Sequence, residues 1–251
     1  MKPTVTIVIP VYNEEADLPN CIATLSQFIT ENQVYAWDIL IADNASIDNT
    51  RQVSESLCSE YASVDYFYVP QKGRGRALRL AWLRSTSDIL CYMDVDLSTD
   101  LLHLPEIIDS VSGEYDIAVG SRLSKESQVK RSARREIISQ LYNLIIKTLF
   151  FTQFPDAQCG FKAISKSAAA DLLPLVKDQG WFFDSELLIL AEKNGYHIKD
   201  IPVLWVDDPD SRVNVIKTAR DDIKGLLRLR TRGLSEASKL LRHSRTQYNS
   251  H

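Results

Sequence analysis

The stretch Ile89-Leu90-Cys91-Tyr92-Met93-Asp94-Val95-Asp96 decides the fold, because an apolar run of strand length ends in two carboxylates. Side chains alternate along a strand, so residues two apart point to the same side. Asp94 and Asp96 can therefore face one hard cation where the strand ends. Carboxylates that hold Mg²⁺ or Mn²⁺ and leave other positions to phosphate oxygens are typical of nucleotide chemistry. An Asp-x-Asp pair also occurs in ordinary acidic turns, so its meaning depends on the surrounding sequence.

Apolar runs of strand length alternate with amphipathic stretches of helix length through the first 120 residues. The apolar runs lie at 5–9, 39–42, 66–69, 89–93 and 117–119, and the amphipathic stretches lie near 15–29, 49–60, 74–86 and 100–110. This alternation predicts right-handed βαβ units and an α/β fold, with a mostly parallel, Rossmann-like sheet and helices on both faces. Ligands of such open sheets bind outside the carboxyl ends of the strands.

Residues that suit ligand binding follow the predicted strands at their carboxyl ends. They are Pro10, Tyr12 and Glu14 after the first strand, Asp43 after the second, Lys72 after the third, Asp94 and Asp96 after the fourth, and Arg122 after the fifth. A carboxylate such as Asp43 can accept a hydrogen bond from a base edge or a ribose hydroxyl. The Gly-rich stretch 72–77 opens a predicted helix but lacks the Walker A ending, so it indicates an anion site only together with the other motifs.

Composition predicts a folded α/β protein. The 251 residues include 45% hydrophobic and 25% charged residues, which is usual for a globular chain. The four cysteines form no Cys-x-x-Cys pair, which argues against a zinc site or a disulfide framework and favours a reducing cytosol. The N-terminal apolar run is too short for a signal peptide, and no stretch reaches the ~18 apolar residues of a membrane span. We therefore expect a cytoplasmic protein.

Positive charge is concentrated in two segments. Residues 212–245 hold ten Lys or Arg against three Asp or Glu, although the whole chain has a net charge of −4. Residues 122–136 form a basic loop, and an apolar stretch with polar residues at helical spacing follows at 137–154. We expect one domain over 1–211, which includes this loop and an amphipathic helix within 122–154, and a basic helical tail over 212–251. The apolar helix is either buried against the sheet or lies on a bilayer, and the tail suits an anionic partner such as a membrane surface.

Together these motifs resemble the family 2 inverting glycosyltransferases with the GT-A fold. The motifs are Val8-Ile9-Pro10-Val11-Tyr12-Asn13-Glu14, Asp43 with Ser46-Ile47-Asp48-Asn49-Thr50, Lys72-Gly73-Arg74-Gly75, Met93-Asp94-Val95-Asp96-Leu97-Ser98, Gly120-Ser121-Arg122, Asp156-Ala157-Gln158-Cys159-Gly160-Phe161-Lys162 and Phe183-Asp184-Ser185-Glu186. They follow the family's order. The chain looks most like the group that transfers sugars to dolichyl or polyprenyl phosphate, such as dolichol-phosphate mannose synthase and dolichyl-phosphate glucosyltransferase. One departure is Asn44, where many relatives carry a second Asp.

The resemblance implies a role for each motif. The nucleotide-sugar donor would be held by Pro10, Tyr12, Glu14, Asp43, Lys72, Asp94, Asp96 and Asp156, with Mg²⁺ or Mn²⁺ on Asp94 and Asp96. The acceptor phosphate would meet Arg122, Arg131, Arg135, Ser211 and Arg212. Asp184 and Glu186 lie where other family members place a base, so they join Asp94, Asp96 and Arg122 as candidate catalytic residues. Both could instead form an acidic first turn that stabilises a helix over 184–194.

The implied reaction moves a hexose, glucose or mannose, from a UDP- or GDP-linked donor to a polyprenyl or dolichyl phosphate with inversion. A hydroxyl acceptor usually needs a general base, whereas a lipid phosphate is already anionic near neutral pH and needs positioning by arginine. Such an enzyme would lie peripherally at the cytoplasmic face of a membrane and contact it through 137–154 and 213–245. Both segments could instead be oligomer contacts.

Two other functions stay open. A family 2 transferase could extend a soluble or cell-surface glycan, and a degenerate transferase fold could serve as a non-catalytic membrane adaptor. The presence of both predicted metal carboxylates, of Asp43 and of Arg122 argues against the adaptor. A nucleic-acid-binding module is disfavoured because the body is acidic and few aromatic residues interleave with the basic tail.

Overall fold

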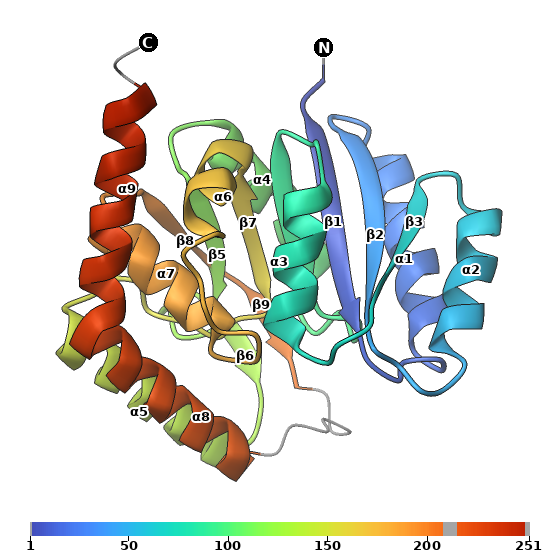
Figure 1. Cartoon of the computed structure of the whole chain (residues 1–251). Helices are drawn as coiled ribbons and strands as arrows, with labels where there is room; N and C mark the ends of the chain where they lie inside the picture. The colour runs from blue at the N-terminus through green and yellow to red at the C-terminus, as the bar shows by residue number, and fades with distance from the viewer. Residues whose placement is uncertain (1, 208–214, 249–251) are drawn as a thin grey trace.

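The computed structural model describes residues 2–207 and 215–248, over which strands and helices alternate (Figure 1). The strands are β1 (Thr4–Val11), β2 (Ala36–Asn44), β3 (Val64–Val69), β4 (Ile89–Met93), β5 (Ile117–Ser121), β6 (Gln128–Lys130), β7 (Phe161–Ser165), β8 (Ile198–Pro202) and β9 (Leu204–Val206). The α-helices are α1 (Leu18–Glu31), α2 (Thr50–Glu60), α3 (Arg74–Arg84), α4 (Leu104–Ser112), α5 (Ala133–Phe150), α6 (Lys166–Leu172), α7 (Phe183–Lys193), α8 (Val215–Arg228) and α9 (Leu234–Tyr248). A 3-10 turn, Leu101–His103, precedes α4, and a π-helical turn, Leu229–Gly233, joins α8 to α9.

The described strands form a large sheet in the order β3-β2-β1-β4-β7-β5-β8 and a small sheet of β6 and β9. Neighbours in the large sheet are parallel except at β7, which runs antiparallel to both β4 and β5. The predicted mostly parallel sheet is thus confirmed. The side chains of β4 are all buried, and those of β1 from Val5 to Ile9 are buried as well. Such continuous burial is expected of strands that are covered on both faces.

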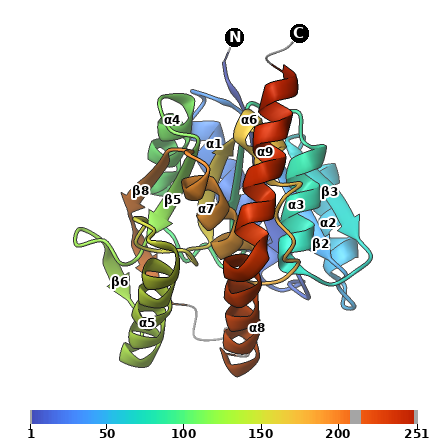
Figure 2. The same cartoon turned by 60° about the vertical axis from the view of Figure 1, so that its left-hand side comes forward.

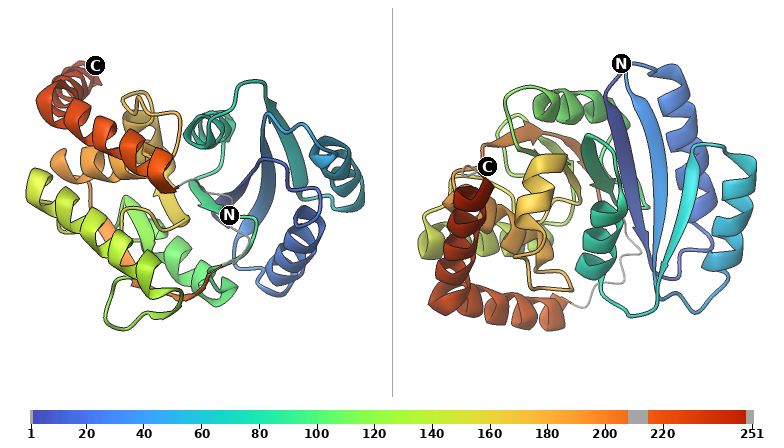
Figure 3. Two further views of the ribbon diagram at one scale, coloured as in Figure 1. Left: turned by 90° about the horizontal axis from the view of Figure 1, so that it is seen from below. Right: turned by 45° about the horizontal axis from the view of Figure 1, so that its top comes forward.

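Helices cover both faces of the large sheet. Helices α3, α6 and α7 lie on one face, and α1 and α4 lie on the other, as the view along the strands shows (Figures 1 and 3). The carboxyl ends of the parallel strands point toward one rim of the sheet, the lower rim in Figure 1. At this rim Met93 of β4 pairs with Phe161 of β7, so the chain leaves β4 at the point where it enters β7.

Several predicted boundaries differ from the observed ones for local reasons. The helix expected over 100–110 is interrupted, because Pro105 lies in the first turn of α4 and cannot donate a backbone hydrogen bond. A separate 3-10 turn precedes it, and the Asp100 side chain caps that turn by accepting from the Leu102 amide at 2.9 Å. Helix α1 begins at Leu18, again with a proline in its first turn. Strands β7 and β8 were not expected from the sequence.

The basic tail is helical where it is described, and it packs onto the body. Leu226, Leu229, Ala237 and Leu241 are buried. Gly225 lies so close to the Phe182 ring that an added Cβ would stand 2.3 Å from it, which means that α8 crosses the chain just before α7 with no room for a side chain. The predicted domain boundary at 211/212 lies outside the described residues and stays a prediction.

Candidate active site

Asp94 and Asp96 lie together at the rim, on the turn that follows β4. They line a small pocket whose other residues are Met93, Leu97, Ser98, Thr99, Gly160 and Trp205. The turn is held by the Leu97 amide, which donates to the Asp94 carbonyl at 3.2 Å, and by the Ser98 amide, which donates to Asp96 Oδ1 at 2.9 Å. Asp94 and Asp96 therefore line the same pocket, and their predicted role as metal ligands stays a prediction.

Two carboxylates are the kind of ligand that a hard divalent cation prefers. A Cβ at Gly160 would stand 1.7 Å from Asp94 Oδ2. Only glycine at position 160 therefore leaves room for the Asp94 carboxylate. The described residues contain no cluster of three or more His, Cys, Asp or Glu arranged to hold a metal. Asp94 and Asp96 could therefore supply only part of a coordination shell. Mg²⁺ and Mn²⁺ accept this arrangement when water and substrate phosphate provide the remaining oxygens.

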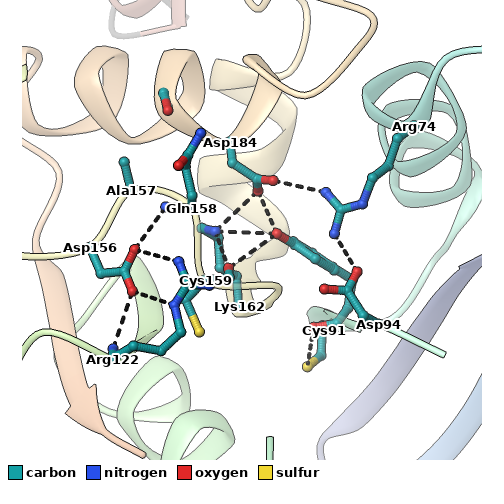
Figure 4. Close-up of polar contacts among 12 residues, drawn as sticks. Arg74, Cys91, Asp94, Arg122, Asp156, Ala157, Gln158, Cys159, Lys162 and Asp184 are labelled. Atoms are coloured by element: carbon teal, nitrogen blue, oxygen red, sulfur yellow. Dashed lines mark hydrogen bonds and ion pairs between the residues drawn. The ribbon is translucent and has the colours of Figure 1, made fainter. Parts of the chain in front are cut away.

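Arg74 bridges two of the predicted site carboxylates (Figure 4). Its Nη2 donates to Asp94 Oδ1 at 2.5 Å, and its Nη1 donates to Asp184 Oδ2 at 2.9 Å. The guanidinium lies 5.0 Å from the ring centroid of Tyr92 and 5.0 Å from that of Trp181. The Gly-rich stretch thus brings a cation to Asp94, whereas the sequence had assigned a role only to its neighbour Lys72.

Asp184 is buried among hydrogen-bond donors. The Tyr92 hydroxyl donates to Asp184 Oδ1 at 2.5 Å, and Lys162 Nζ lies 3.1 Å from the same oxygen. Burial opposes the negative charge, but Lys162 and Arg74 outweigh it and hold the pKa of the Asp184 carboxyl below its usual value. No role for Lys162 was predicted from the sequence. Its signal was a lone lysine inside an otherwise apolar strand, where only a buried partner can stabilise it.

Glu186 is buried on α7 and is occupied by structural contacts. Arg228 of α8 donates to both carboxylate oxygens, at 2.8 and 2.9 Å. The backbone amides of Lys177 and Asp178 also donate to Oε2, at 3.2 and 2.8 Å. With four donors around it, this carboxylate has little capacity to accept a proton from a substrate, and the geometry favours a role in joining α8 to α7.

Arg122 and Asp156 form a buried ion pair. Arg122 donates through Nε to Asp156 Oδ2 at 2.7 Å and through Nη2 to Oδ1 at 3.0 Å, and its backbone amide adds a third contact at 3.2 Å. Burial disfavours the charged carboxylate, but Arg122 reverses this and lowers the pKa of Asp156 to about 2. The Arg122 guanidinium also lies 5.4 Å from the ring centroid of Trp205, which lines the pocket. Arg122 thus contacts a residue of the pocket wall, while Asp156 itself is fully buried.

The predicted nucleotide-binding residues lie around the ends of β1, β2 and β3. Asp43 is fully buried; it accepts from the Ser46 amide and from the Tyr66 hydroxyl, both at 2.8 Å. The Lys72 ammonium lies 3.2 Å above the Tyr12 ring, so these two predicted residues are in contact. Tyr66 was not anticipated as a partner of this group.

Pro10 and Glu14 flank this group at the end of β1. Pro10 is half-buried in β1 opposite Ala42, and the Glu14 amide donates to Thr50 Oγ1 at 2.8 Å. Between them Asn13 has φ +57°, and its side chain accepts from the Ile47 amide at 2.9 Å. The turn after β1 is therefore held against the turn after β2.

The predicted acceptor-phosphate arginines are paired with carboxylates. Arg131 Nε donates to Glu136 at 2.5 Å, and Arg135 donates to Asp207. The Ser132 hydroxyl caps α5 between them. Ser211 and Arg212, the last two predicted acceptor residues, lie outside the described residues.

Comparison with known proteins decides the family. Residues 6–173 match the sequence profile described as Glycosyl transferase family 2. The chain belongs to this family. Its fold is the GT-A type: the chain superposes on glucosyl-3-phosphoglycerate synthase of Mycobacterium tuberculosis with a TM-score of 0.69 at 17% identity, covering 91% of this chain and 80% of that one. Mannosyl-3-phosphoglycerate synthase from Rubrobacter xylanophilus gives a TM-score of 0.67 at 15% identity, over 92% and 76% of the two chains.

Sequence relatives of this family 2 chain include archaeal and eukaryotic glycosyltransferases. "Glycosyltransferase AglD" of Haloferax volcanii is 33% identical over 228 residues, which is 88% of this chain but 35% of that protein. The chain therefore spans about a third of this relative. "Dolichyl-phosphate beta-glucosyltransferase" of Saccharomyces cerevisiae is 27% identical over 86% of this chain and 72% of its own length. The mouse protein of the same name is 27% identical over 94% and 77% of the two chains.

Proposed function

We propose that this family 2 glycosyltransferase moves a hexose from a nucleotide-diphospho-sugar to the phosphate of a polyprenyl or dolichyl lipid, with inversion at the anomeric carbon. The observation that carries the proposal is the pair Asp94 and Asp96, which line one pocket at the carboxyl rim of the sheet. Relatives named dolichyl-phosphate beta-glucosyltransferase align with most of this chain, which supports the lipid phosphate as acceptor and favours glucose over mannose.

On the donor side, the chain's own residues bind and orient the nucleotide-sugar. Tyr12 and Lys72, in contact at the ends of β1 and β3, would hold the nucleotide beside Asp43. Asp94 and Asp96 would hold Mg²⁺ or Mn²⁺, which when bound stabilises the charge that develops on the departing diphosphate. UDP and GDP both fit this scheme.

On the acceptor side, positioning is sufficient. A phosphate monoester carries roughly −1.5 to −2 charges near neutral pH, so it needs no base to become a nucleophile. The lowered pKa of Asp184 makes that carboxylate a weak base, in agreement with such an acceptor. We propose that the acceptor phosphate replaces the carboxylates of Glu136 and Asp207 as the group bound by Arg131 and Arg135. A guanidinium binds phosphate and carboxylate through the same pair of N–H groups.

A surface for the lipid lies on α5 and α8. Both helices project past the carboxyl rim of the sheet at the same end of the molecule (Figure 2). The exposed apolar residues of this pair, called here the α5–α8 apolar surface, are Ile137, Ile138, Leu141, Leu144, Ile145, Ile223 and Leu227. The opposite side of α5 packs inward through buried Ile146 and Phe150. One side of the predicted amphipathic helix is therefore buried and another is exposed.

We propose that the α5–α8 apolar surface rests on the cytoplasmic face of a membrane. Arg220 and Lys224 on α8 would add attraction to anionic lipids of roughly 1 kcal/mol per basic residue. None of the helices in the described ranges has the length and apolarity needed to cross a bilayer.

The direct test is sugar transfer with labelled donors. UDP-glucose, UDP-galactose and GDP-mannose, each radiolabelled, are incubated with a polyprenyl phosphate and Mn²⁺, and the mixture is partitioned between water and organic solvent. We expect label from one donor to enter the organic phase and to return to water after mild acid, which cleaves a sugar phosphate. Label that appears only in a water-soluble glycan would favour the glycan-extending alternative, and donor binding without transfer to any acceptor would favour the adaptor.

A further inference from the structure

Arg74 donates through Nη2 to Oδ1 of Asp94, one of the two predicted metal carboxylates, at 2.5 Å. We propose that Arg74 is a built-in counter-ion of Asp94, which makes metal binding by the free enzyme weak and dependent on the nucleotide donor. This inference rests on the proposed function, because it concerns the predicted metal carboxylate.

The side chain of Arg74 is immobilised. Its side chain is 10% exposed, it bridges two carboxylates, and two aromatic rings flank its guanidinium. Its backbone is fixed as well, because the amides of Gly75 and Arg76 donate to the carbonyls of Gly180 and Gln179 at 3.2 and 3.1 Å. A guanidinium held in this way loses little further conformational entropy when it stays bound to Asp94.

Close packing keeps the start of α3 in this position. A Cβ at Gly75 would stand 2.4 Å from the Cβ of Phe183, and one at Gly73 would stand 2.5 Å from the Gln179 carbonyl oxygen. Helix α3 therefore lies against the segment before α7 with no space for other residues. Because Asp184 follows Phe183 directly, the same packing sets the distance between Arg74 and its second carboxylate.

The charges around the pocket are nearly balanced without a metal ion. Two cations, Arg74 and Lys162, lie among the three carboxylates Asp94, Asp96 and Asp184. The cluster carries a small net negative charge, so a divalent cation alone would make it net positive. A cation that binds Asp94 must also compete with the guanidinium of Arg74, whose Nη2 lies 2.5 Å from Asp94 Oδ1. Repulsion and competition both weaken metal binding in the free enzyme.

A nucleotide diphosphate removes both obstacles at once. Its negative charge compensates for the added cation, and its oxygens supply ligands that Asp94 and Asp96 alone do not provide. Metal and donor should therefore bind with strong positive coupling, each raising the affinity of the protein for the other. The wild-type protein would hold little metal until the donor is present.

The test is a titration with Mn²⁺ that does not depend on catalysis. Free Mn²⁺ is measured by electron paramagnetic resonance in wild type, Arg74→Met and Arg76→Met, each without nucleotide and with saturating UDP or GDP. Arg76→Met is the matched control: the substitution removes the same charge from the same end of α3, and Arg76 donates to the Lys72 carbonyl rather than to Asp94 or Asp184. Without nucleotide, we expect Arg74→Met to bind Mn²⁺ about 10-fold more tightly than wild type, and Arg76→Met to stay within about twofold.

The nucleotide arms separate this inference from the proposed function. With nucleotide, wild type should bind Mn²⁺ tightly and its difference from Arg74→Met should shrink. Equal or weaker Mn²⁺ binding by Arg74→Met without nucleotide, with wild type still binding Mn²⁺ when nucleotide is added, would overturn the role of Arg74 and leave the metal site standing. Absence of Mn²⁺ binding by wild type with either nucleotide would refute the metal site and the inference with it. Arg74→Lys, which keeps the charge but cannot bridge both carboxylates, should give an intermediate affinity and serves if Arg74→Met does not fold.

Discussion

The guanidinium of Arg122 donates to both oxygens of Asp156, a carboxylate that solvent does not reach. Removing one member of a buried pair leaves an uncompensated charge, at a cost of about 3–5 kcal/mol. We therefore expect Arg122→Met to lower the free energy of unfolding by about 3 kcal/mol in urea denaturation. Lys125→Met, which removes an exposed cation from the same loop, should change it by less than about 0.5 kcal/mol. Equal stability of Arg122→Met and wild type would contradict the assigned pair.

The same pair predicts a dependence on acid. The pKa of Asp156 is lowered from 3.8 in the unfolded chain to about 2 in the fold, so ionised Asp156 stabilises the fold above about pH 4. This contribution is lost as the pH falls toward 2. Urea titrations at pH 5 and at pH 3 should therefore show a smaller difference between Arg122→Met and wild type at the lower pH. A difference that grows on acidification would argue against the pair.

Asp94→Asn and Asp96→Asn test the metal carboxylates. Each variant removes a negative oxygen ligand without changing the size of the side chain, so we expect transfer to fall by at least about 10³-fold while the thermal unfolding midpoint changes little. Glu106→Gln, at an exposed carboxylate on α4, is the matched control and should retain wild-type turnover. Wild-type turnover in either aspartate variant, or in the presence of excess chelator, would remove the metal from the mechanism.

Asp184→Asn tests whether a carboxylate acts as general base. The low pKa of Asp184 keeps it ionised at neutral pH, so it should not produce an acid limb in the pH profile of kcat/KM. We expect the limb near about pH 6 to come from the acceptor phosphate and to stay in place in the variant, although turnover falls by about 10- to 100-fold because Arg74 and Lys162 lose a partner. Disappearance of the limb in Asp184→Asn would instead identify Asp184 as the base.

Leu141→Glu combined with Leu144→Glu tests the α5–α8 apolar surface. Both leucines are more than half exposed, so the fold should tolerate the change, whereas a bilayer should reject the added charges. In flotation with vesicles of phosphatidylcholine and an anionic lipid, we expect at least about 10-fold weaker binding than wild type. Val34→Glu, at an exposed apolar residue between α1 and β2, is the control and should bind like wild type. Unchanged flotation of the double variant would place the membrane contact elsewhere.

Asp222 of α8 predicts the opposite dependence of stability on pH from that of Asp156. It is 3% exposed; Gln158 donates to its Oδ2 at 3.0 Å, and Oδ1 has no hydrogen-bond partner in the described part of the chain. Burial, with a smaller effect of Asp178, raises its pKa to about 7. The folded protein then binds a proton that the unfolded chain releases above pH 3.8, so the free energy of unfolding decreases as the pH rises from about 4 to about 7.

Asp222→Asn should remove this dependence. At pH 8 we expect the variant to be more stable than wild type by at least about 1 kcal/mol in urea denaturation, whereas below about pH 4, where the carboxyl is neutral in both the folded and the unfolded chain, the two should be nearly equal. Asp221→Asn, at the exposed neighbour that pairs with Lys224, is the control and should show no such difference. A variant that is less stable at pH 8 would mean that Asp222 is ionised and has a partner.

The rim of the sheet could be predicted from the sequence because strand periodicity and strand length are local properties. The runs that became β1 to β5 carry continuous apolar side chains, and polar residues end each of them, so the placement of Asp43 and Asp94 at one edge follows from topology alone. The GT-A fold expected from the motifs is confirmed by the family and by the solved structures. The roles assigned to single residues stay predictions.

Partners in space could not be predicted in the same way. Strand β7 carries Lys162 as its second residue, which hides the apolar pattern of the strand. The burial of Lys162 depends on Asp184, twenty-two positions later in the chain. The pairs of Arg74 with Asp94, Arg122 with Asp156, and Glu186 with Arg228 join residues that are far apart in sequence. Ion-pair partners of this kind follow from tertiary packing, which periodicity does not report.

The reversed direction of β7 has a consequence for how such enzymes diversify. Because β7 starts at the rim where β4 ends, the connection 151–160 ends beside Asp94 at Gly160. Insertions or deletions earlier in this connection would leave the pairing of Met93 with Phe161 unchanged. Asp156 lies in the same connection and must stay buried against Arg122, so a change of length can be accommodated only in the residues before it.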